Sequence, residues 1–270
     1  MKELTLRKIA EACHGTVAPE AETVTVTGVQ SDSRRVRPGD LFVAIKGEKA
    51  DGHDFVAMAA SLGAKAALVA RPVEAPIPTI LVADTIRAYG DLAAAYREHA
   101  GITVIGITGS VGKTPPKEMT ACLLARSFHT ARTEGNHNNN LGLPMTILDM
   151  PDDTEVAVLE MGMNHFGEMA YLTSIARPDI AIITNIGTMH IEHLGSREGI
   201  LQAKLEIFRG VPKNGVGVFN GDEPLLWNVR ADGGHKKYYF GIENHTCDVL
   251  ATDIQELEDG MRFVVSGFGH

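Results

Sequence analysis

The chain has 270 residues, of which 34 are acidic and 25 are basic, so its formal net charge is −9. This length predicts one large or two ordinary domains, and 44% hydrophobic with 22% charged residues is typical of a soluble globular protein with a buried core. The composition excludes a disordered or collagen-like chain. The acidic balance argues against a general nucleic-acid-binding protein, because such proteins need a basic surface to neutralise phosphates.

Cysteines and hydropathy indicate the compartment. Cys13, Cys122 and Cys247 are far apart and odd in number, so they predict neither a disulfide framework nor a CxxC metal site. The charged N-terminal segment is unlike a signal peptide, and no apolar run approaches the roughly 18 residues of a membrane span. We therefore expect a cytoplasmic protein with no membrane span.

The first hundred residues alternate between strand and helix patterns. Short apolar runs at 41–47, 66–70 and 79–83 predict strands. Helical spacing of apolar residues predicts a helix within 53–64 and an amphipathic helix from Thr85 to Ala100, stopped by Gly101. We expect a small α/β domain over residues 1–99.

The pattern resumes after residue 100. Strands are expected at 103–108, 156–162, 179–187 and 215–220, and helices after Thr114 and over 197–208. The continuous apolar strands are typical of a buried parallel sheet. The runs at 238–240, 248–255 and 262–267, with a turn at Asp259-Gly260, predict antiparallel strands. The fold class is therefore α/β, with a mostly parallel-sheet domain over 100–270.

A phosphate-binding loop is the sharpest local signal. In GITGSVGKT (106–114) a predicted strand enters a Gly-rich turn that ends in Lys113 and Thr114. Backbone N–H groups of such a loop surround phosphate oxygens, the lysine reaches the β/γ-phosphates and the threonine hydroxyl ligates Mg²⁺. The strict pattern needs glycine where Ile107 stands, so an ordinary Gly-rich turn is the alternative. The predicted ATP-binding residues here are Thr108, Gly109, Ser110, Val111, Gly112, Lys113 and Thr114.

Pro115 and Pro116 follow this loop directly. Proline is tolerated in the first turn of a helix, but it has no N–H group to donate to a phosphate. We expect a weaker phosphate grip than a loop without these prolines has.

Longer runs carry a family resemblance. They are SDSRRVRPGDLFVAIKGEKADGHDFV (31–56), EGNHNNNLGLP (134–144), LEMGMNHFGEM (159–169) and TNIGTMHIEHLGSREGILQAKLEIF (184–208). With the phosphate loop, they resemble the Mur ligase family, and GNHNNN with MGMNHFGE favours its MurF type. The resemblance implies an N-terminal domain that binds the UDP-sugar peptide and a middle domain that binds ATP.

The resemblance also implies a reaction in peptidoglycan precursor synthesis. ATP and Mg²⁺ would serve a ligase that phosphorylates a carboxylate of UDP-MurNAc-tripeptide and joins the resulting acyl phosphate to D-Ala-D-Ala. Charge neutralisation and positioning account for most of such catalysis.

The catalytic residues that the resemblance implies are Lys113, Glu160, His190 and Lys204. Metal binding would involve Thr114, Glu160, His190 and Lys204, the last as a carbamate. Alternatives stay open for three of these residues: Glu160 could cap a neighbouring helix, His193 rivals His190, and a helical lysine is usually solvated.

Two further groups of residues are implied to bind nucleotide. They are Asn136, His137 and Asn138 in the Asn-rich run, and Asn220 and Asp222 in VFNGDEP. Both groups could equally provide turn chemistry, because Asn and Asp favour turns.

The UDP-substrate residues are expected in the N-terminal domain. Ser31, Asp32, Ser33 and Arg34 are the main candidates and Lys46 supports them, together with the 51–54 run. An arginine can pair with a phosphate in fork geometry. Without the resemblance, SDSRR would be an ordinary polar loop.

Other functions compete with a MurF-type ligase. A generic P-loop kinase or ATPase would not explain the N-terminal resemblance, and folylpolyglutamate synthase should lack such a domain. A non-catalytic module that binds UDP-sugar peptide or nucleotide is the third possibility. MurF proteins have a third, C-terminal domain that this sequence does not match, so we expect little or no ligase turnover from this chain alone. We also expect an incomplete middle domain, because the sequence ends within its β-rich tail, before the helices that should cover the sheet.

Overall fold

The computed structural model describes residues 1–231 and 234–269. Its contacts divide the chain into two compact units. The first contains Met1–Ile102 and Thr133–Glu155, and the second contains Thr103–Arg132 and the chain from Val156 onward. Within the described ranges, no helix is long and apolar enough to cross a membrane.

A five-stranded sheet forms the centre of the first unit. Its strand order is β2-β7-β6-β5-β4, and all neighbours are parallel except β2 and β7. The strands are β2 (Thr16–Val17), β4 (Gly28–Gln30), β5 (Asp40–Val43), β6 (Ala66–Val69) and β7 (Thr79–Leu81), and β1 (Leu4–Thr5) pairs separately with β3 (Thr25–Val26).

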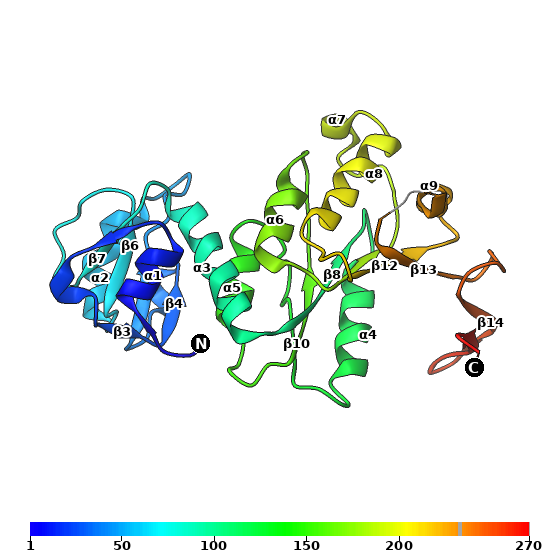
Figure 1. Ribbon diagram of the computed structural model, residues 1–270, viewed down its shortest axis with the longest axis horizontal. Helices are drawn as coiled ribbons and strands as arrows, with labels where there is room; N and C mark the ends of the chain where they lie inside the picture. The colour runs from blue at the N-terminus through cyan, green and yellow to red at the C-terminus, as the bar shows by residue number, and fades with distance from the viewer. Residues whose placement is uncertain (232–233, 270) are drawn as a thin grey trace. The chain divides into compact units, whose positions relative to one another are not determined.

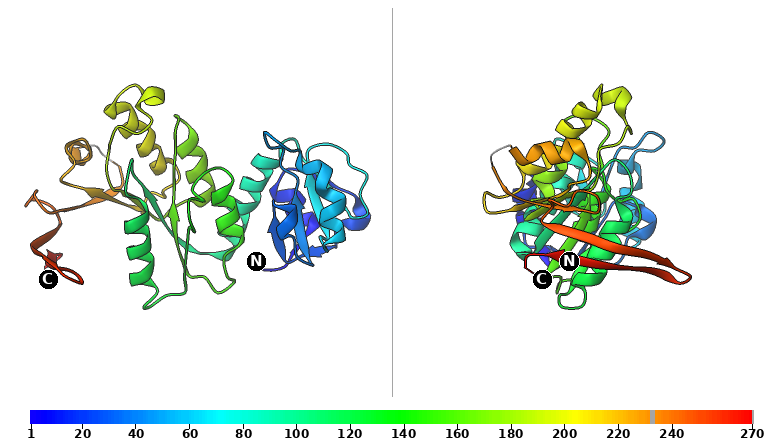
Figure 2. Two further views of the ribbon diagram at one scale, coloured as in Figure 1. Left: turned by 180° about the vertical axis from the view of Figure 1, so that it is seen from behind. Right: turned by 90° about the vertical axis from the view of Figure 1, so that its right-hand side faces the viewer.

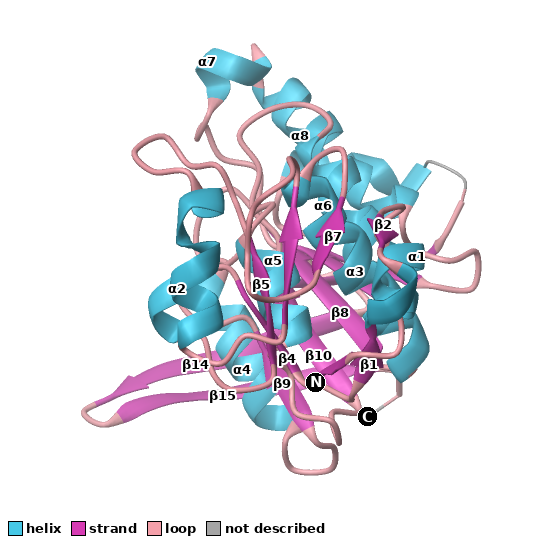
Figure 3. Cartoon of the chain, turned by 90° about the vertical axis from the view of Figure 1, so that its left-hand side faces the viewer, coloured by secondary structure: helices cyan, strands magenta, loops and turns pink. Residues whose placement is uncertain are grey.

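Helices cover this sheet because its strands are apolar on both faces (Figure 3). Phe42 and Ala44 pack with Val56 and Ala59 of α2. The helices are α1 (Leu6–Ala12), α2 (Val56–Ser61), α3 (Thr85–Ala100) and α5 (Gly142–Leu148), with 3₁₀ turns at Pro19–Ala21, Ser33–Arg35 and Gly52–Phe55. The predicted helix from Thr85 to Ala100 is confirmed, with Asp84 as its N-cap and Gly101 in the left-handed conformation after its end.

Residues 133–155 pack with the first unit, although the sequence-based division places them after residue 100. Helix α5 provides this packing, because it contacts α3 and β4. The assignment of substrate binding to 1–99 and of ATP binding to 100–270 stays a prediction.

An eight-stranded sheet with the order β15-β14-β13-β12-β11-β8-β10-β9 organises the second unit. Every pair is parallel except β14 and β15, which are antiparallel. The strands are β8 (Thr103–Thr108), β9 (Thr130–Arg132), β10 (Val156–Glu160), β11 (Ile180–Ile183), β12 (Val216–Asn220), β13 (Lys236–Gly241), β14 (Val249–Leu257) and β15 (Gly260–Gly267). The predicted strand at 103–108 is confirmed.

The helices of the second unit connect these strands (Figure 1). They are α4 (Thr114–Leu124), α6 (Glu168–Ala176), α7 (Ile191–Leu194), α8 (Arg197–Leu205) and α9 (Pro224–Asn228), with 3₁₀ turns at Glu206–Arg209 and Val229–Ala231. Ala121 of α4 packs on Ile105, Ile107 and Val158 of the sheet. The position where the strict loop pattern needs glycine, Ile107, is therefore a fully buried strand residue.

The C-terminal strands require one correction. Tyr238–Phe240 lies in β13, which is parallel to β12 and β14, so its predicted antiparallel pairing is wrong. The apolar pattern of a strand does not encode the direction of its neighbours. The antiparallel pair β14–β15 is confirmed, and it forms a ribbon that projects from the edge of the sheet (Figure 2).

Candidate functional site

Three loops of the second unit follow the carboxyl ends of adjacent parallel strands. The phosphate loop follows β8, Glu160 ends β10, and Asn185 lies just beyond β11. Strand β8 lies between the other two, and the chain crosses from one side of β8 to the other between β10 and β11. This arrangement is a topological switch point, where open α/β sheets bind ligands.

Two glycines give the phosphate loop its shape. A Cβ at Gly109 would lie 2.0 Å from Thr184 Oγ1, so only glycine fits between the loop and the strand end. Gly112 has a φ of +66°, a left-handed conformation that glycine adopts without strain.

Asn185 holds the loop in place. Its Oδ1 accepts hydrogen bonds from the N–H groups of Ser110 (2.9 Å) and Val111 (3.1 Å), and its Nδ2 donates to Val111 O (2.9 Å). Sequence reasoning did not include Asn185 among the site residues. A polar residue directly after a buried parallel strand was the available signal.

Lys113, Thr114 and Glu160 lie together at the start of α4. Thr114 Oγ1 donates to Glu160 Oε2 at 3.1 Å, and Lys113 Nζ donates to Gly109 O at 3.1 Å. Glu160 is only 3% exposed. Neighbouring hydroxyl and carboxylate oxygens are the hard ligands that Mg²⁺ prefers, so these residues fit the predicted metal.

Lys204 lies on α8 and is buried, with 3% of its surface exposed. Burial, and secondarily the positive charge of Lys113, lowers its pKa from 10.5 to about 7. A solvated helical lysine, the alternative considered above, is excluded.

His190 directly precedes α7 and has a φ of +62°. Its carbonyl oxygen accepts hydrogen bonds from the N–H groups of His193 and Leu194. The rival His193 ring lies 4.3 Å from the ring of His165 between centroids, and its Nε2 is 3.8 Å from Glu192. No cluster of three or more His, Cys, Asp or Glu side chains suited to a metal occurs among the described residues. Of the predicted metal ligands, only Glu160 and His190 are of these types, so such a search does not test the set. The metal set therefore stays a prediction.

Asn220 and Asp222 form a turn. Asn220 Oδ1 accepts from the N–H of Asp222, and the Asp222 carboxylate accepts from the N–H groups of Ile242, Glu243 and Asn244. These contacts support the alternative of turn chemistry. Nearby, Glu223 forms an ion pair with Arg197 at 2.8 Å, a pair that sequence reasoning missed.

The Asn-rich run belongs to the first unit, whereas the phosphate loop belongs to the second. Asn138 N donates to Asn136 O, and His137 N donates to Glu134 O, so the main chain forms tight turns here. The adjacent Asn139, absent from the prediction, accepts from the N–H groups of Leu141 and Gly142 at the start of α5.

The predicted substrate residues of the first unit line two cavities. Ser31, Asp32, Ser33 and Arg34 line a cavity of about 800 Å³ together with Phe42, Phe55 and Leu141. Lys46 lines a separate cavity of about 400 Å³ with His53 and Arg71. The structure therefore groups the first four candidates and separates Lys46 from them.

The Arg34 side chain forms a two-point contact with Asp32. Its Nε and Nη2 atoms donate to the two oxygens of Asp32 at 2.9 and 2.7 Å, and this contact lowers the pKa of Asp32 to about 2. Arg34 is 80% exposed, so its guanidinium is accessible from solvent.

In the smaller cavity, both ring nitrogens of His53 have hydrogen-bond partners. Its Nε2 accepts from the N–H of Ala70 at 2.8 Å, and its Nδ1 is 2.6 Å from Asp51 Oδ1. Because Nε2 accepts, Nδ1 carries the proton in this arrangement.

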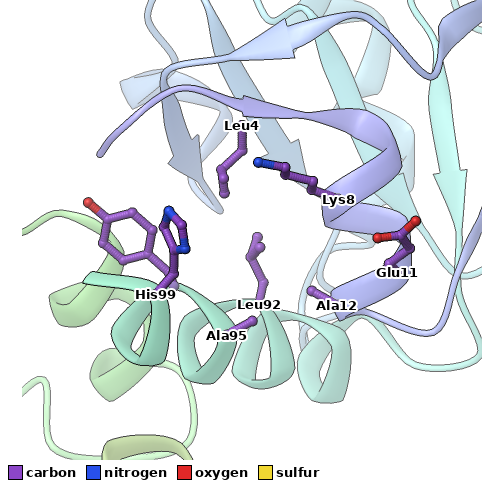
Figure 4. Close-up of a pocket in the computed structure, with 8 residues that line it drawn as sticks. Leu4, Lys8, Glu11, Ala12, Leu92, Ala95 and His99 are labelled. Atoms are coloured by element: carbon purple, nitrogen blue, oxygen red, sulfur yellow. The ribbon is translucent and has the colours of Figure 1, made fainter. Parts of the chain in front are cut away.

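A third cavity, of about 320 Å³, lies between α1 and α3 (Figure 4). Leu92 and Ala95 are part of its apolar lining, and Lys8 and His99 contribute polar groups. It contains none of the predicted site residues.

Comparison with known proteins supports the resemblance. Residues 107–270 match the family described as Mur ligase middle domain, and residues 25–106 match the Mur ligase family, catalytic domain. A Bacillus subtilis (strain 168) protein named UDP-N-acetylmuramoyl-tripeptide--D-alanyl-D-alanine ligase is 44% identical over 271 residues, covering 99% of this chain and 58% of the relative. The Escherichia coli (strain K12) protein of the same name is 39% identical over 98% of the chain. The chain thus spans about 58% of the length of these curated relatives.

Solved structures agree with this match. A crystal structure of MurF from Acinetobacter baumannii has a TM-score of 0.88 at 37% identity, covering 99% of this chain and 61% of that one. MurF ligase from Thermotoga maritima in complex with ADP has a TM-score of 0.79 at 33% identity, covering 90% of this chain and 59% of that one. The predicted fold class and family resemblance are confirmed.

Proposed function

Since the chain belongs to the Mur ligase family, we propose that it supplies the ATP-binding and UDP-substrate-binding parts of a MurF-type ligase. The observation that carries this proposal is the contact of Thr114 Oγ1 with Glu160 Oε2 beside Lys113 at the switch point of the sheet. Relatives named for the joining of D-alanyl-D-alanine to the UDP-tripeptide support the substrate assignment.

The reaction of the whole protein would proceed in two displacements. A carboxylate oxygen of UDP-MurNAc-tripeptide attacks the γ-phosphorus of ATP, and ADP leaves. The amine of D-Ala-D-Ala then attacks the carbonyl carbon of the acyl phosphate, loses a proton, and phosphate leaves with the bonding electrons. Both steps transfer charge onto phosphate oxygens, so cationic groups near them lower the barrier.

Residues of the second unit would have distinct roles. Lys113 neutralises charge on the β- and γ-phosphates, and loop amides orient these groups. Thr114 and Glu160 would hold Mg²⁺, which supplies charge neutralisation when bound. Lys204 as a carbamate and His190 would complete the metal ligands. The low pKa of Lys204 supports this role, because a carbamate forms from the neutral amine.

In the first unit, the cavity at Ser31–Arg34 would bind the UDP part of the substrate. The Arg34 guanidinium, already oriented by Asp32, presents its remaining N–H groups to a phosphate. We place Lys46 in a supporting role at its own cavity. Asn136, His137 and Asn138 stay proposed nucleotide contacts. We do not extend that proposal to Asn220 and Asp222, because the turn uses their side chains.

Calorimetry with two ligands tests the function. We expect Mg-ATP and UDP-MurNAc-tripeptide to bind independently, and Arg34→Ala to weaken only the UDP compound, by about tenfold. Glu160→Gln should weaken only Mg-ATP. The two variants serve as controls for each other. Binding of the UDP compound without Mg-ATP would support a non-ligating module instead, and binding of neither would refute the proposal.

A further inference from the structure

The first turn of α4 contains an unusual pair of residues. An α-helix leaves its first four N–H groups without intrahelical partners, and in α4 these positions are Lys113, Thr114, Pro115 and Pro116. The first intrahelical bond runs from Lys117 N to Lys113 O at 3.2 Å. The two prolines therefore remove no bond from the helix, but they remove two of the four N–H groups that could bind an anion.

Neighbouring amides of the loop are also occupied. The N–H groups of Ser110 and Val111 donate to Asn185 Oδ1. Within the described residues, the N–H groups of Gly112, Lys113 and Thr114 make no hydrogen bond with the protein. The donors available to a phosphate chain at the helix start are therefore three consecutive amides and the Lys113 ammonium.

These donors are placed to bind the terminal phosphates of a nucleotide. In a loop of this type the lysine would reach the β- and γ-phosphates, and the threonine hydroxyl would hold Mg²⁺. Residues 112–114 would therefore serve the terminal phosphates. The α-phosphate of the same nucleotide would then meet the next positions of the helix, which are Pro115 and Pro116.

We propose that Pro115 and Pro116 leave the α-phosphate of a bound nucleotide without a main-chain hydrogen bond, so that this site binds ATP through its β- and γ-phosphates. This inference rests on the proposed ATP-binding function. Hydrogen bonds to charged oxygens are the strong ones, so their absence at the α-phosphate weakens the binding of ATP.

The test restores the missing donors. Pro115→Ala/Pro116→Ala returns two N–H groups without adding a polar side chain, and alanine suits the helix. Calorimetry would measure Mg-ATP and Mg-ATPαS, in which sulfur, a weak acceptor, replaces an α-phosphate oxygen. We expect the unaltered chain to bind both within twofold. The double variant should bind Mg-ATP about tenfold more tightly and prefer it over Mg-ATPαS several-fold.

A matched control comes from Pro19→Ala, because Pro19 also starts a helical turn but belongs to the first unit. It should leave both affinities unchanged. A preference of more than fivefold for Mg-ATP over Mg-ATPαS in the unaltered chain would overturn the inference without any variant. Unaltered affinity in the double variant, with Mg-ATP still bound, would overturn the inference and leave the proposed function standing. If neither protein binds Mg-ATP, the nucleotide-binding function fails and the inference fails with it.

Discussion

Arg34 in the first unit and Lys113 in the second are both predicted to bind phosphate, but their surroundings differ. Arg34 is exposed and forms a two-point contact with Asp32. Close to Lys113 in the chain, Thr108 Oγ1 and Ser110 Oγ are buried and have no hydrogen-bond partner among the described residues. Lys204 is also buried, and the positive charge of Lys113 contributes to lowering its pKa.

The two units therefore differ in whether the polar groups of the predicted anion site already have hydrogen-bond partners. Polar groups buried without partners destabilise a fold by about 1–3 kcal/mol each. The second unit keeps two such hydroxyl groups at its phosphate loop, where a bound ligand would satisfy them. The first unit has already satisfied its arginine, so a ligand there gains orientation more than charge compensation. Variants should therefore have larger effects on binding in the second unit.

The largest effect is expected from Lys113→Met. Loss of the ammonium should weaken Mg-ATP binding about 100-fold, because this group contacts two phosphates in the proposed complex. Calorimetry would measure the affinity, and Lys213→Met, at an exposed lysine of the same unit, is the control. A change smaller than threefold would remove Lys113 from the site.

A smaller effect is expected from Asn185→Ala. The substitution removes three hydrogen bonds that hold Ser110 and Val111. Mg-ATP affinity should fall about tenfold, and the Tm should fall by about 2–4 °C. Asn228→Ala at an exposed asparagine should change neither. If affinity rises instead, the freed amides bind phosphate themselves and Asn185 is not a positioning residue.

The smallest effect concerns the first unit and depends on pH. The Asp32 pKa is lowered to about 2 by the Arg34 side chain, so its contact stabilises the fold above the unfolded pKa of about 3.9 and is lost as the pH falls toward 2. Because Asp32 is one-third exposed and Arg34 mostly so, Asp32→Asn should cost no more than about 0.5 kcal/mol at pH 7.

Urea unfolding at pH 7 and near pH 2 would measure this contribution. The difference between Asp32→Asn and the unaltered chain should be much smaller at the lower pH, where about half of the Asp32 carboxylate is protonated. Glu20→Gln, at an exposed residue, should show no such pH dependence. A difference that is as large near pH 2 as at pH 7 would mean that the carboxylate charge is not its source.

Local patterns in the sequence predicted much of this architecture. The helix Thr85–Ala100 and the strand Thr103–Thr108 have their predicted limits because caps, glycine stops and apolar runs are local signals. The phosphate loop was recognisable despite Ile107, since the essential glycines, Gly109 and Gly112, lie in the turn itself.

Other features depended on contacts between distant residues. The direction of β13 is set by its neighbours β12 and β14, which an apolar pattern does not identify. The packing of residues 133–155 with the first unit depends on α5 meeting α3. Asn185 lies 74 residues from Val111 along the chain, so only the adjacency of β8 and β11 brings it to the loop.

The sequence by itself determined the α/β class, the family and the residue types of the loop, because these are carried by periodicity and motif. Only the tertiary structure decided how those residues are used. Burial lowers the pKa of Lys204, the Asp222 carboxylate accepts a hydrogen bond from Ile242, 20 residues away, and Asn185 holds the phosphate loop from 74 residues away. Burial and hydrogen-bond partners arise from residues far apart in the chain, and folding alone brings them together.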